Sequence, residues 1–429
     1  MSANSAGTLL NATRNLRERA KYYGYAARAR VLRQISGLAA ASGKRKVLIL
    51  DPGLIGYFGH HAELTQILKS TLSPRFDVRV YANFRVDGQL ALQLGAHPIF
   101  YETIYPPRSD QDFRSVNTAM TRSLVSGLGQ IDTEDLSPTA LAVMHTAMIF
   151  QLDALAEWIS KLPVDRRPTL VIVFHAPLEF GVRNADWLMA VSHAKRAAGV
   201  LKETGRVQFA SVTDRLSSRI ADQLGYPCTT LPVPLRWLDV RDAAITPLHP
   251  AFGFFGGLRL EKGAGLLADA LPGFAALHKD VRFVIHAPPE ESDEAASRSI
   301  SQAPGVSLLR TTFKDKRDYF KKILSVGCVL LPYDPASYAM RASGVLLEAL
   351  AFGRMVITTK GTWLEEQVHK WRANSFVMSK FSADELTQCM AQARIALLSS
   401  VEAPHFDHEV VSKNNSDSFS AAVMSLVGD

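Results

Sequence analysis

Two glycine-containing segments in the second half of the sequence carry the residue types that bind phosphate. The first is Gly256-Gly257-Leu258-Arg259-Leu260-Glu261-Lys262-Gly263, which follows an apolar, strand-like run. A helix that starts after such a turn offers backbone N–H groups and the positive end of its dipole to an anion. Arg259 and Lys262 add two cations, and the glycines let both reach one anion. This segment predicts a diphosphate site.

The second segment, Arg341-Ala342-Ser343-Gly344-Val345-Leu346-Leu347-Glu348, also joins a strand-like run to the start of a helix. Glu348 lies about one turn inside that helix, where a carboxylate would repel phosphate but could accept hydrogen bonds from sugar hydroxyls. Its neighbours in the helix are apolar, so we expect the carboxylate to have a hydrogen-bonding partner. A diphosphate at one segment and a polyol at the other suggest a nucleotide-sugar.

The alternation of strand-like and helix-like segments indicates what positions these residues. It predicts an α/β fold of two doubly wound, Rossmann-like sheets, one on each side of a proline-rich stretch. We predict an N-terminal domain over 46–234, a linker over 235–250 and a C-terminal domain over 251–405. A C-terminal helix is predicted within 406–429, and it could pack back on the N-terminal domain.

Several individual elements are also predicted. A strand over 46–50 leads through a loop over 51–59 into a helix that begins near residue 60, and one long helix is predicted over 140–161. Residues 105–134 have weak periodicity and give no prediction. Thr362-Trp363-Leu364-Glu365 fits a helix capping box, and one helix is predicted over 410–427.

Positive charge is concentrated at the N-terminus. Residues 1–46 hold ten Arg or Lys and one Glu, whereas the remainder holds 38 basic and 40 acidic residues. This distribution argues against a nucleic-acid-binding protein. Apolar residues recur at helical spacing within 1–45, so we predict a basic amphipathic extension whose residues 1–40 could contact an anionic membrane. The alternative is a solvated basic helix that docks on the protein.

The sequence contains neither a run of eighteen apolar residues nor a secretory signal pattern, so we expect a cytoplasmic protein, peripheral to the inner face of the membrane if its extension binds lipid. Its three cysteines, Cys228, Cys328 and Cys389, are far apart in the sequence. They are typical of core residues in a reducing compartment rather than of a disulfide set or a metal site.

Residues 251–379 resemble the C-terminal domain of retaining GT-B glycosyltransferases of the family 4 (glycosyl transferases group 1) type. The resemblance rests on the Gly-Gly turn that ends in Glu-Lys-Gly and on Glu348, which matches the second acid of the family's Glu-x7-Glu motif. It implies GT-B architecture, with two Rossmann-like domains facing a central cleft. It assigns the ribose to Glu348, the base to Phe313, and the donor diphosphate to Gly257, Arg259, Lys262, Ser343, Gly344 and Val345.

The sequence departs from the family pattern at Met340, eight residues before Glu348. The family has a glutamate there, beside the donor sugar. Arg341 and Ser343 could supply other polar contacts, so the donor-sugar region is expected at Met340 and Arg341. The identity of the donor sugar stays open.

The N-terminal half is expected to bind the acceptor. Gly56, Gly59, His60 and His61 lie on the loop after the first strand, at the edge of a doubly wound sheet where ligands bind. The resemblance implies a glycine loop here near donor and acceptor. His60 or His61 could orient a hydroxyl or carry a proton, or they could be an ordinary pair at a helix start.

Two further residues follow strand-like runs in this half. His175 resembles a family histidine near the transferred sugar, although a core or turn histidine is the alternative. Asp51, at the end of the first strand, is a weaker candidate. His175, His60 and His61 are the predicted catalytic residues.

These features predict a glycosyltransferase that moves a sugar from a nucleotide-sugar to a glycan or lipid-linked acceptor, in cell-surface polysaccharide or glycoconjugate synthesis. The resemblance implies a retaining reaction. Arg259, Lys262 and the helix N–H groups could stabilise a leaving diphosphate without a metal, so neither metal nor cofactor is expected. The alternatives are a nucleotide-sugar epimerase on the same fold and a non-catalytic protein that binds nucleotides or glycans.

Overall fold

The computed structural model describes residues 43–57, 59–106, 112–235, 250–289, 292–311, 313, 315–399 and 406–428. The predicted membrane contact of residues 1–40 and most of the predicted linker lie outside the described residues. None of the described helices is long and apolar enough to cross a bilayer. The described residues divide into two compact units, the first lying within Met1–Ser211, Ser217–Thr229 and Val423–Asp429 and the second within Val212–Leu216 and Thr230–Ala422.

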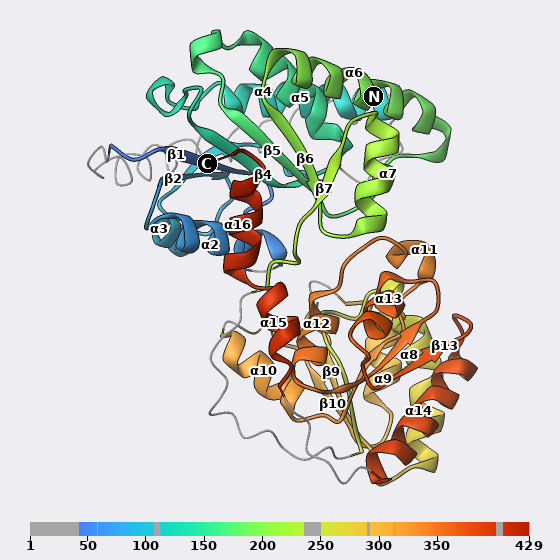
Figure 1. The fold of residues 1–429 in the computed structure, drawn as a ribbon. Coiled ribbons are helices and arrows are strands. Elements are labelled where there is room, and N and C mark those ends of the chain that lie inside the picture. The colour runs from blue at the N-terminus through green and yellow to red at the C-terminus, as the bar shows by residue number, and fades with distance from the viewer. Residues whose placement is uncertain are drawn as a thin grey trace, which may run out of the picture. The chain divides into compact units, whose positions relative to one another are not determined.

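A seven-stranded sheet forms the centre of the first unit (Figure 1). Its strands are β1 (Lys46–Asp51), β2 (Asp77–Asn83), β3 (Ala96–Phe100), β4 (Leu141–Ala147), β5 (Thr169–Phe174), β6 (Val207–Ser211) and β7 (Cys228–Thr230). The strand order is β3-β2-β1-β4-β5-β6-β7, and the neighbours from β3 to β6 are parallel. The direction of winding therefore reverses between β1 and β4. Ligands bind at such switch points in open α/β sheets.

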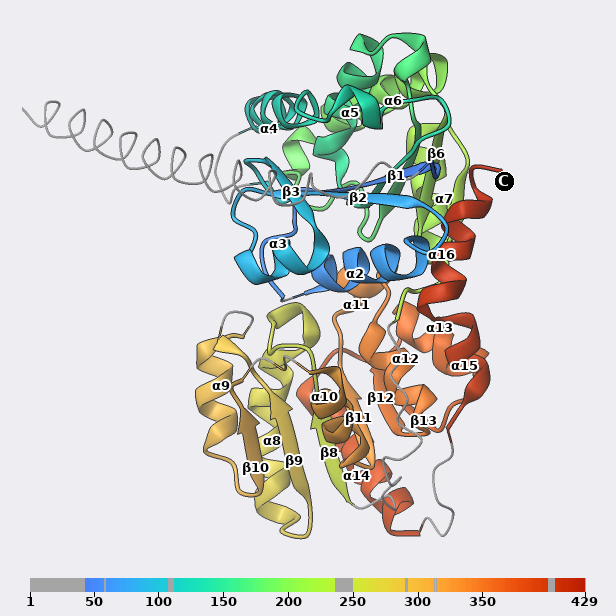
Figure 2. The same cartoon turned by 90° about the vertical axis from the view of Figure 1, so that its left-hand side faces the viewer.

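Helices cover both faces of this sheet (Figure 2). They are α2 (His60–Leu72), α3 (Gly88–Leu94), α4 (Phe113–Leu128), α5 (Ile149–Lys161), α6 (Trp187–Thr204) and α7 (Asp214–Leu224). On one face α4, α5 and α6 pack against one another, and on the other α2 packs against β1, β2 and β4. The core lies in these two layers, because the central strands are buried on both faces.

The prediction of one helix over 140–161 is wrong in its first half. Residues Leu141–Ala147 form the buried strand β4, and the helix begins only at Ile149. Alanine, leucine and methionine favour a helix locally, but a central parallel strand also appears as an unbroken apolar run. Pairing with β1 and β5 on either side outweighs the local preference.

The stretch that gave no prediction, 105–134, contains the helix α4. Asp112 caps it, since its Oδ1 accepts a hydrogen bond of 3.0 Å from the N–H of Ser115. Seven of its residues are buried, including Phe113 and Leu124. The cap and the buried stripe together account for a helix in a segment of weak periodicity.

The second unit repeats the same winding with six strands (Figure 1). They are β8 (Ala251–Phe254), β9 (Arg282–His286), β10 (Val306–Leu309), β11 (Cys328–Leu331), β12 (Met355–Thr359) and β13 (Ser375–Met378). All neighbours in the order β10-β9-β8-β11-β12-β13 are parallel. Here the switch point lies between β8 and β11.

Helices alternate with the strands of this sheet. They are α8 (Ala264–Leu277), α9 (Glu294–Ser301), α10 (Lys316–Leu324), α11 (Pro335–Tyr338), α12 (Gly344–Ala351), α13 (Trp363–Lys370), α14 (Ala383–Ser399), α15 (His408–Lys413) and α16 (Ser416–Ser425). The last helix, α16, ends in the segment Val423–Asp429 that belongs to the first unit. On one face of the sheet, α8 packs between α9 and α14.

The single helix predicted over 410–427 is wrong, because two helices meet at Asn414 and Asn415. The Nδ2 atoms of both asparagines donate to backbone carbonyls near the end of α15, at 2.8–3.1 Å. The Oδ1 atom of Asn415 accepts from the N–H of Ser418 at 2.8 Å at the start of α16. Asparagine side chains compete with helical hydrogen bonds in this way and interrupt the helix.

The capping motif predicted at the start of α13 is confirmed, with one difference. The Oγ1 atom of Thr362 accepts from the N–H of Glu365 at 3.3 Å, and Glu365 reaches back to the N–H of Gly361 instead of Thr362. We expect Thr362→Ala to lower the free energy of unfolding by about 1 kcal/mol, since a lost N-cap costs about that much. Thermal or urea unfolding would measure this. Thr362→Ser, which retains a capping hydroxyl, should lose less than half as much.

Candidate functional site

The first glycine-containing segment connects β8 to α8 at the switch point of the second unit. Lys262 is only 8% exposed, and its Nζ donates to the carbonyl of Gly256 and lies 5.7 Å from the ring centroid of Tyr333. Arg259 is more exposed and lies 3.2 Å from a carboxylate oxygen of Glu261. The buried ammonium and the more exposed guanidinium can both serve an anion at this turn.

Glycines are required at three points of this turn. Gly256, Gly257 and Gly263 have φ values of 90°, 80° and 84°, in the left-handed region that side chains disfavour. A Cβ atom at Gly263 would lie 2.2 Å from the carbonyl oxygen of Pro332, and one at Gly256 would lie 2.9 Å from Nζ of Lys262. The glycines therefore let the backbone approach both the neighbouring loop and the lysine.

Three backbone N–H groups of this segment are used inside the turn. The N–H groups of Lys262, Gly263 and Ala264 donate to carbonyl groups inside the turn, at 2.9–3.2 Å. A short 3-10 turn at Leu260–Lys262 forms before α8 begins, and it uses these donors locally. The cations, rather than these three N–H groups, are what the segment presents.

The second segment has the expected helix start. Ser343 caps α12, because its Oγ accepts from the N–H of Leu346 at 3.3 Å. Gly344 and Val345 occupy the first turn of α12, whose N–H groups have no partner within a helix. A Cβ atom at Gly256 would lie 3.5 Å from Cγ2 of Val345, so the two predicted segments lie next to each other.

Two buried tyrosines join these segments. Tyr333 and Tyr338 pack with ring centroids 4.4 Å apart, and the Arg341 guanidinium lies 4.7 Å above the ring of Tyr338. Burial raises the pKa of Tyr338, while the nearby Arg341 and Arg259 act to lower it. Arg259, Lys262 and Arg341 therefore surround one pair of aromatic rings.

Glu348 has the hydrogen-bonding partners that its position predicted. It is 4% exposed, accepts from the Tyr319 hydroxyl at 2.8 Å, and lies 3.1 Å from Nζ of Lys316. Each partner contacts a different carboxylate oxygen, so the carboxylate is fixed in orientation. Such a carboxylate can still accept hydrogen bonds from a diol, because each oxygen has more than one acceptor direction.

Phe313 lies on the loop after β10, with its ring 4.8 Å from that of His286 and 5.7 Å from that of Tyr319. It is partly buried. The rings of Phe313, His286 and Tyr319 lie next to Glu348, since Tyr319 contacts both Phe313 and Glu348. Desolvation lowers the pKa of His286, so its imidazole is neutral near pH 7.

Met340 contributes its backbone rather than its side chain to the recorded contacts. Its carbonyl accepts from the Thr213 hydroxyl at 2.7 Å. The side chain of Met340 has no carboxylate, so it cannot replace the glutamate that the family has at this position. Arg341 is the neighbouring polar side chain, as the sequence suggested, and it lies against Tyr338.

In the first unit, Asp51 and His61 meet at the switch point. Asp51 closes β1 and is 1% exposed, and its Oδ1 accepts from Nδ1 of His61 at 2.7 Å and from the N–H of Gly53 at 3.0 Å. Its Oδ2 accepts from the Thr65 hydroxyl at 2.9 Å and from Nε2 of His145 at 3.1 Å. Four donors therefore surround this buried carboxylate.

This environment keeps Asp51 ionised. Burial raises its pKa, but His61 and His145, through their charge and hydrogen bonds, outweigh burial and hold it well below the ordinary value of an aspartate. An ionised carboxylate accepts hydrogen bonds only, so Nδ1 of His61 carries a proton. Nε2 of His61 faces the Tyr105 hydroxyl at 3.3 Å.

His60 and His175 lie beside this cluster. The ring of His60 is 4.4 Å from His61 and 5.6 Å from His175, and Nε2 of His175 donates to the carbonyl of His145 at 2.9 Å. Desolvation and the neighbouring His61 and His175 lower the pKa of His60. The three predicted catalytic histidines therefore lie together.

The two glycines predicted to form an acceptor loop occupy the connection between β1 and α2. Gly59 has a φ of 80° and precedes the first residue of α2. A Cβ atom would meet no neighbour within 4 Å at either Gly56 or Gly59. Conformation at Gly59, rather than crowding, accounts for a glycine there.

Asp51, His61 and His145 are also the group among the described residues whose geometry could hold a metal ion, with one ligand atom of each within 4.8 Å of the others. The carboxylate, however, uses a separate oxygen for each imidazole, and both oxygens have a second donor. This arrangement is that of a hydrogen-bonded network. It offers a cation no open carboxylate oxygen.

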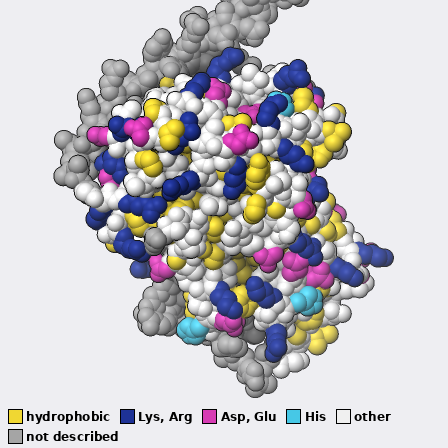
Figure 3. Space-filling model, turned by 45° about the horizontal axis from the view of Figure 1, so that its top comes forward, with side chains coloured by type: hydrophobic (Ala, Val, Ile, Leu, Met, Phe, Trp, Pro, Cys, Tyr) yellow, Lys and Arg dark blue, Asp and Glu magenta, His cyan; other side chains and the backbone are white. Residues whose placement is uncertain are grey.

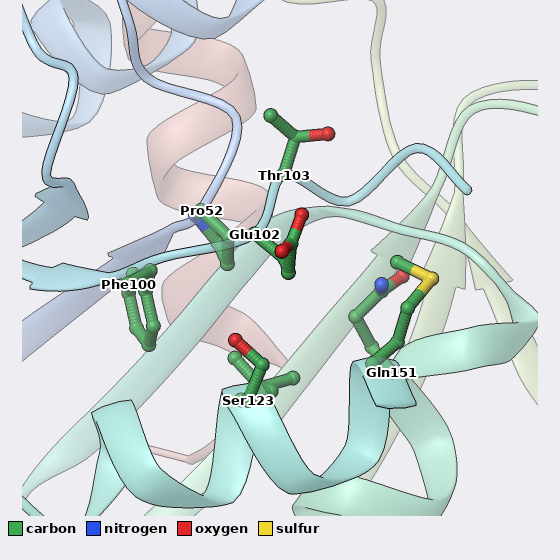
Figure 4. Close-up of a pocket in the computed structure, with 8 residues that line it drawn as sticks. Pro52, Phe100, Glu102, Thr103, Ser123 and Gln151 are labelled. Atoms are coloured by element: carbon green, nitrogen blue, oxygen red, sulfur yellow. The ribbon is translucent and has the colours of Figure 1, made fainter. Parts of the chain in front are cut away.

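A small cavity lies near this cluster in the first unit (Figure 4). It has room for about one water molecule, which is far too little for a sugar. Gln151 at its edge is held by the N–H of Met148 and the carbonyl of Ile104. The lining residues are Pro52, Phe100, Glu102, Thr103, Met120, Ser123, Leu124 and Gln151.

The face of the molecule in Figure 3 mixes charges of both signs. Lys and Arg side chains alternate there with Asp and Glu, and hydrophobic side chains lie between them in small patches. On the described part of that face, basic and acidic side chains are therefore not separated into two regions.

Sequence reasoning missed several residues of these clusters. His145 was hidden by the helix predicted over 140–161, and Tyr319, Lys316 and Tyr105 carry no motif. Thr65 could have been found, since it lies four residues after His61 and therefore on the same face of α2.

Comparisons with known proteins match either the second half of the chain or most of its length. A family model described as Glycosyl transferases group 1 matches residues 249–399. No curated protein sequence matches this chain.

Solved structures match most of the chain. The apo form of the lipopolysaccharide outer core galactosyltransferase WaaB matches with a TM-score of 0.58 and 13% identity, over 89% of this chain and 99% of that one. Anabaena Alr3699/HepE in complex with UDP and glucose matches with a TM-score of 0.54 and 15% identity, over 90% and 100%. The N-terminal domain of Candida albicans trehalose-6-phosphate phosphatase matches with a TM-score of 0.60 and 11% identity, over 91% and 98%. These likenesses confirm the predicted GT-B fold.

Proposed function

We propose that this chain is a glycosyltransferase of GT-B fold and that its donor is a nucleotide-sugar. Two findings support the activity: residues 249–399 match the glycosyl transferases group 1 model, and a solved galactosyltransferase matches most of the chain in fold. The second unit would bind this donor and the first unit the acceptor. The acceptor would be a glycan or a lipid-linked glycan of cell-surface polysaccharide or glycoconjugate synthesis. We expect the anomeric configuration to be retained.

The observation that carries this proposal is the order of chemical groups in the second unit. Lys262 and Arg259 lie at the turn after β8, the fixed carboxylate of Glu348 lies in α12 beside them, and Phe313 and Tyr319 continue from Glu348. Cations suit a diphosphate, a carboxylate suits a ribose diol and aromatic rings suit a base. The spatial order of cations, carboxylate and aromatic rings thus suits a nucleoside diphosphate.

The same cations provide a route for catalysis without a metal. When the bond to the donor sugar breaks, negative charge develops on the leaving diphosphate. Lys262, Arg259 and the N–H groups at the start of α12 are positioned to stabilise that charge. HepE, which matches in fold, was solved with UDP and with UDP-glucose. Uridine nucleotides are therefore the first donors to test.

The experiment is a donor panel. The full chain is incubated with UDP-glucose, UDP-galactose, UDP-N-acetylglucosamine, GDP-mannose and ADP-glucose, with and without EDTA, and release of free sugar and nucleoside diphosphate is followed. We expect slow hydrolysis of one donor class that EDTA does not abolish. Epimerised donor without release of nucleotide would show an epimerase instead, and binding without turnover under any acceptor would show a non-catalytic protein.

A second arm addresses the acceptor. Once the active donor is identified, lipid-linked and soluble glycans are offered together as acceptors. The amount of each product is measured, and NMR determines the anomeric configuration of the new bond. A membrane role for residues 1–40 remains a prediction, and a preference for the lipid-linked acceptor that is lost on deleting them would support it. An inverted product would contradict the proposed stereochemistry.

A further inference from the structure

We infer that His286 is a specificity-determining residue of the proposed donor site, and that it selects nucleotides whose base carries a ring N–H, as uracil and guanine do. Cytosine and adenine have an unprotonated nitrogen at the corresponding ring position and are disfavoured. The inference rests on the proposed function and adds the class of base to it. Every residue that it uses belongs to the second unit.

His286 ends β9, at the same edge of the sheet as the glycine turn that follows β8. Its register partner in β10 is Leu309, so the loop after β10 begins beside it. In this loop, the carbonyl of Thr311 accepts a hydrogen bond from Nε2 of His286 at 3.0 Å, and the ring of Phe313 lies 4.8 Å from the imidazole. The strand and the loop thus fix the orientation of the imidazole.

The hydrogen bond to Thr311 also fixes the tautomer of His286. A carbonyl oxygen can only accept, so Nε2 carries a proton. Desolvation lowers the pKa of His286 most, and the charge of Lys262 lowers it further, although the bond to Thr311 acts to raise it. The ring is therefore neutral near pH 7, and Nδ1 offers a lone pair and no hydrogen.

Among the described residues, the lone pair of Nδ1 has no hydrogen-bonding partner. His286 is 6% exposed, and Nδ1 itself is out of reach of water. A buried acceptor in this state costs free energy, and such atoms are uncommon in folded proteins. A ligand that donates an N–H to Nδ1 would remove that cost.

The neighbours of His286 favour the edge of a base as that donor. The ring of Phe313 is 4.8 Å from His286 and 5.7 Å from Tyr319, whose hydroxyl donates to Glu348 at 2.8 Å. Two aromatic rings therefore separate the imidazole from the carboxylate that we propose to hold the ribose. A base stacks readily on such rings. A base on Phe313 would bring its edge to the adjacent imidazole.

The chemistry of the bases turns this arrangement into a choice. Uracil has an N–H at N3 and guanine has one at N1, so either can donate to Nδ1. Cytosine and adenine have a lone pair at these positions, which would repel the lone pair of Nδ1 and leave both unpaired. Because Nδ1 is buried without a ligand, the side chain of Phe313 must shift when a base binds, a change that is common at binding sites.

The first test determines the tautomer and needs no nucleotide. NMR of the full chain labelled with ¹⁵N-histidine, assigned with the His286→Gln variant, should show a neutral His286 protonated on Nε2. The result is independent of the proposed function. A wild-type His286 that is protonated on Nδ1 would overturn the inference, since Nδ1 would then have no lone pair to offer.

The second test is isothermal titration of the full chain with two matched pairs of nucleotides, UDP with CDP and GDP with ADP. The pair that binds more tightly identifies the size of the base. Within that pair, the nucleotide with the ring N–H should bind at least about tenfold more tightly than the other. Equal affinities or the reverse preference would overturn this inference alone, whereas no binding of any of the four would overturn the proposed donor site as well.

Two variants separate the acceptor at Nδ1 from the bond to Thr311. The amide nitrogen of His286→Gln can take the place of Nε2 and donate to Thr311, but no acceptor remains at Nδ1. The amide oxygen of His286→Asn can take the place of Nδ1. We expect His286→Gln to reduce the preference to within about twofold and His286→Asn to keep at least about fivefold.

His369→Gln changes an exposed histidine of α13 and should leave the preference as in the wild type. Melting temperatures show which variants are folded. A folded His286→Gln with the full wild-type preference would overturn the inference. If that variant does not fold, the wild-type tautomer and the wild-type preference still decide it.

Discussion

Lys262→Ala is expected to weaken the binding of nucleoside diphosphates by about 10- to 100-fold, or about 1.5–3 kcal/mol, the range for hydrogen bonds to charged groups. The ammonium is buried, so it meets an anion where water screens little. Arg259→Ala should lose less, because Arg259 is more exposed and already pairs with Glu261. Isothermal titration with UDP, GDP and ADP measures both.

Two controls separate binding from folding. Lys262 also donates to the carbonyl of Gly256, so each variant's melting temperature must be compared with that of the wild type. Lys279→Ala removes an exposed cation outside the turn and should leave affinity unchanged. Equal affinity of Lys262→Ala and wild type, with both folded, would contradict the proposed diphosphate site.

Glu348→Gln is expected to weaken nucleoside diphosphate binding by about tenfold, or about 1.4 kcal/mol, while leaving inorganic diphosphate binding unchanged or stronger. The carboxylate accepts from Tyr319 and lies beside Lys316, and we propose that it also accepts from the ribose diol. Glutamine keeps the shape but loses the charge that strengthens those bonds. Removing a negative charge near the anion should not weaken the binding of a ligand that lacks the ribose, provided that the site stays folded.

The pair of ligands makes this prediction specific. Lys262→Ala should weaken both the nucleoside diphosphate and inorganic diphosphate, whereas Glu348→Gln should weaken only the first. Tyr319→Phe serves as the matched variant, since it removes one hydrogen bond to Glu348 and leaves the charge. Parallel losses for both ligands in Glu348→Gln would mean that Glu348 supports the fold of the site and does not contact ribose.

The groups of the proposed donor site could be predicted because their chemistry is local. Lys262 and the glycines of the same turn lie within eight residues of one another, and the structure adds one contact between Lys262 and Gly256. The apolar neighbours of Glu348 predicted that it has a partner. They could not identify Tyr319 or Lys316, because these lie on the separate helix α10.

The cluster of Asp51, His61 and His145 shows the opposite case. His145 was assigned to a helix because its segment is rich in residues with high helix propensity. In the sheet, Ile49 pairs with Val143, which brings His145 opposite Asp51 two residues further along both strands. That register depends on the pairing of strands about ninety residues apart, which no local pattern encodes.

The sequence by itself determined the alternation that builds two doubly wound sheets, the glycine turns, the cations beside them and the buried position of Glu348. These follow from local properties: hydrophobic period, backbone freedom at glycine and the cost of a buried charge. Only the tertiary structure decided that Asp51, His61 and His145 form one network, and that Tyr319 and Lys316 hold Glu348. Both depend on strand order and packing, where the energy of long-range contacts outweighs local preference.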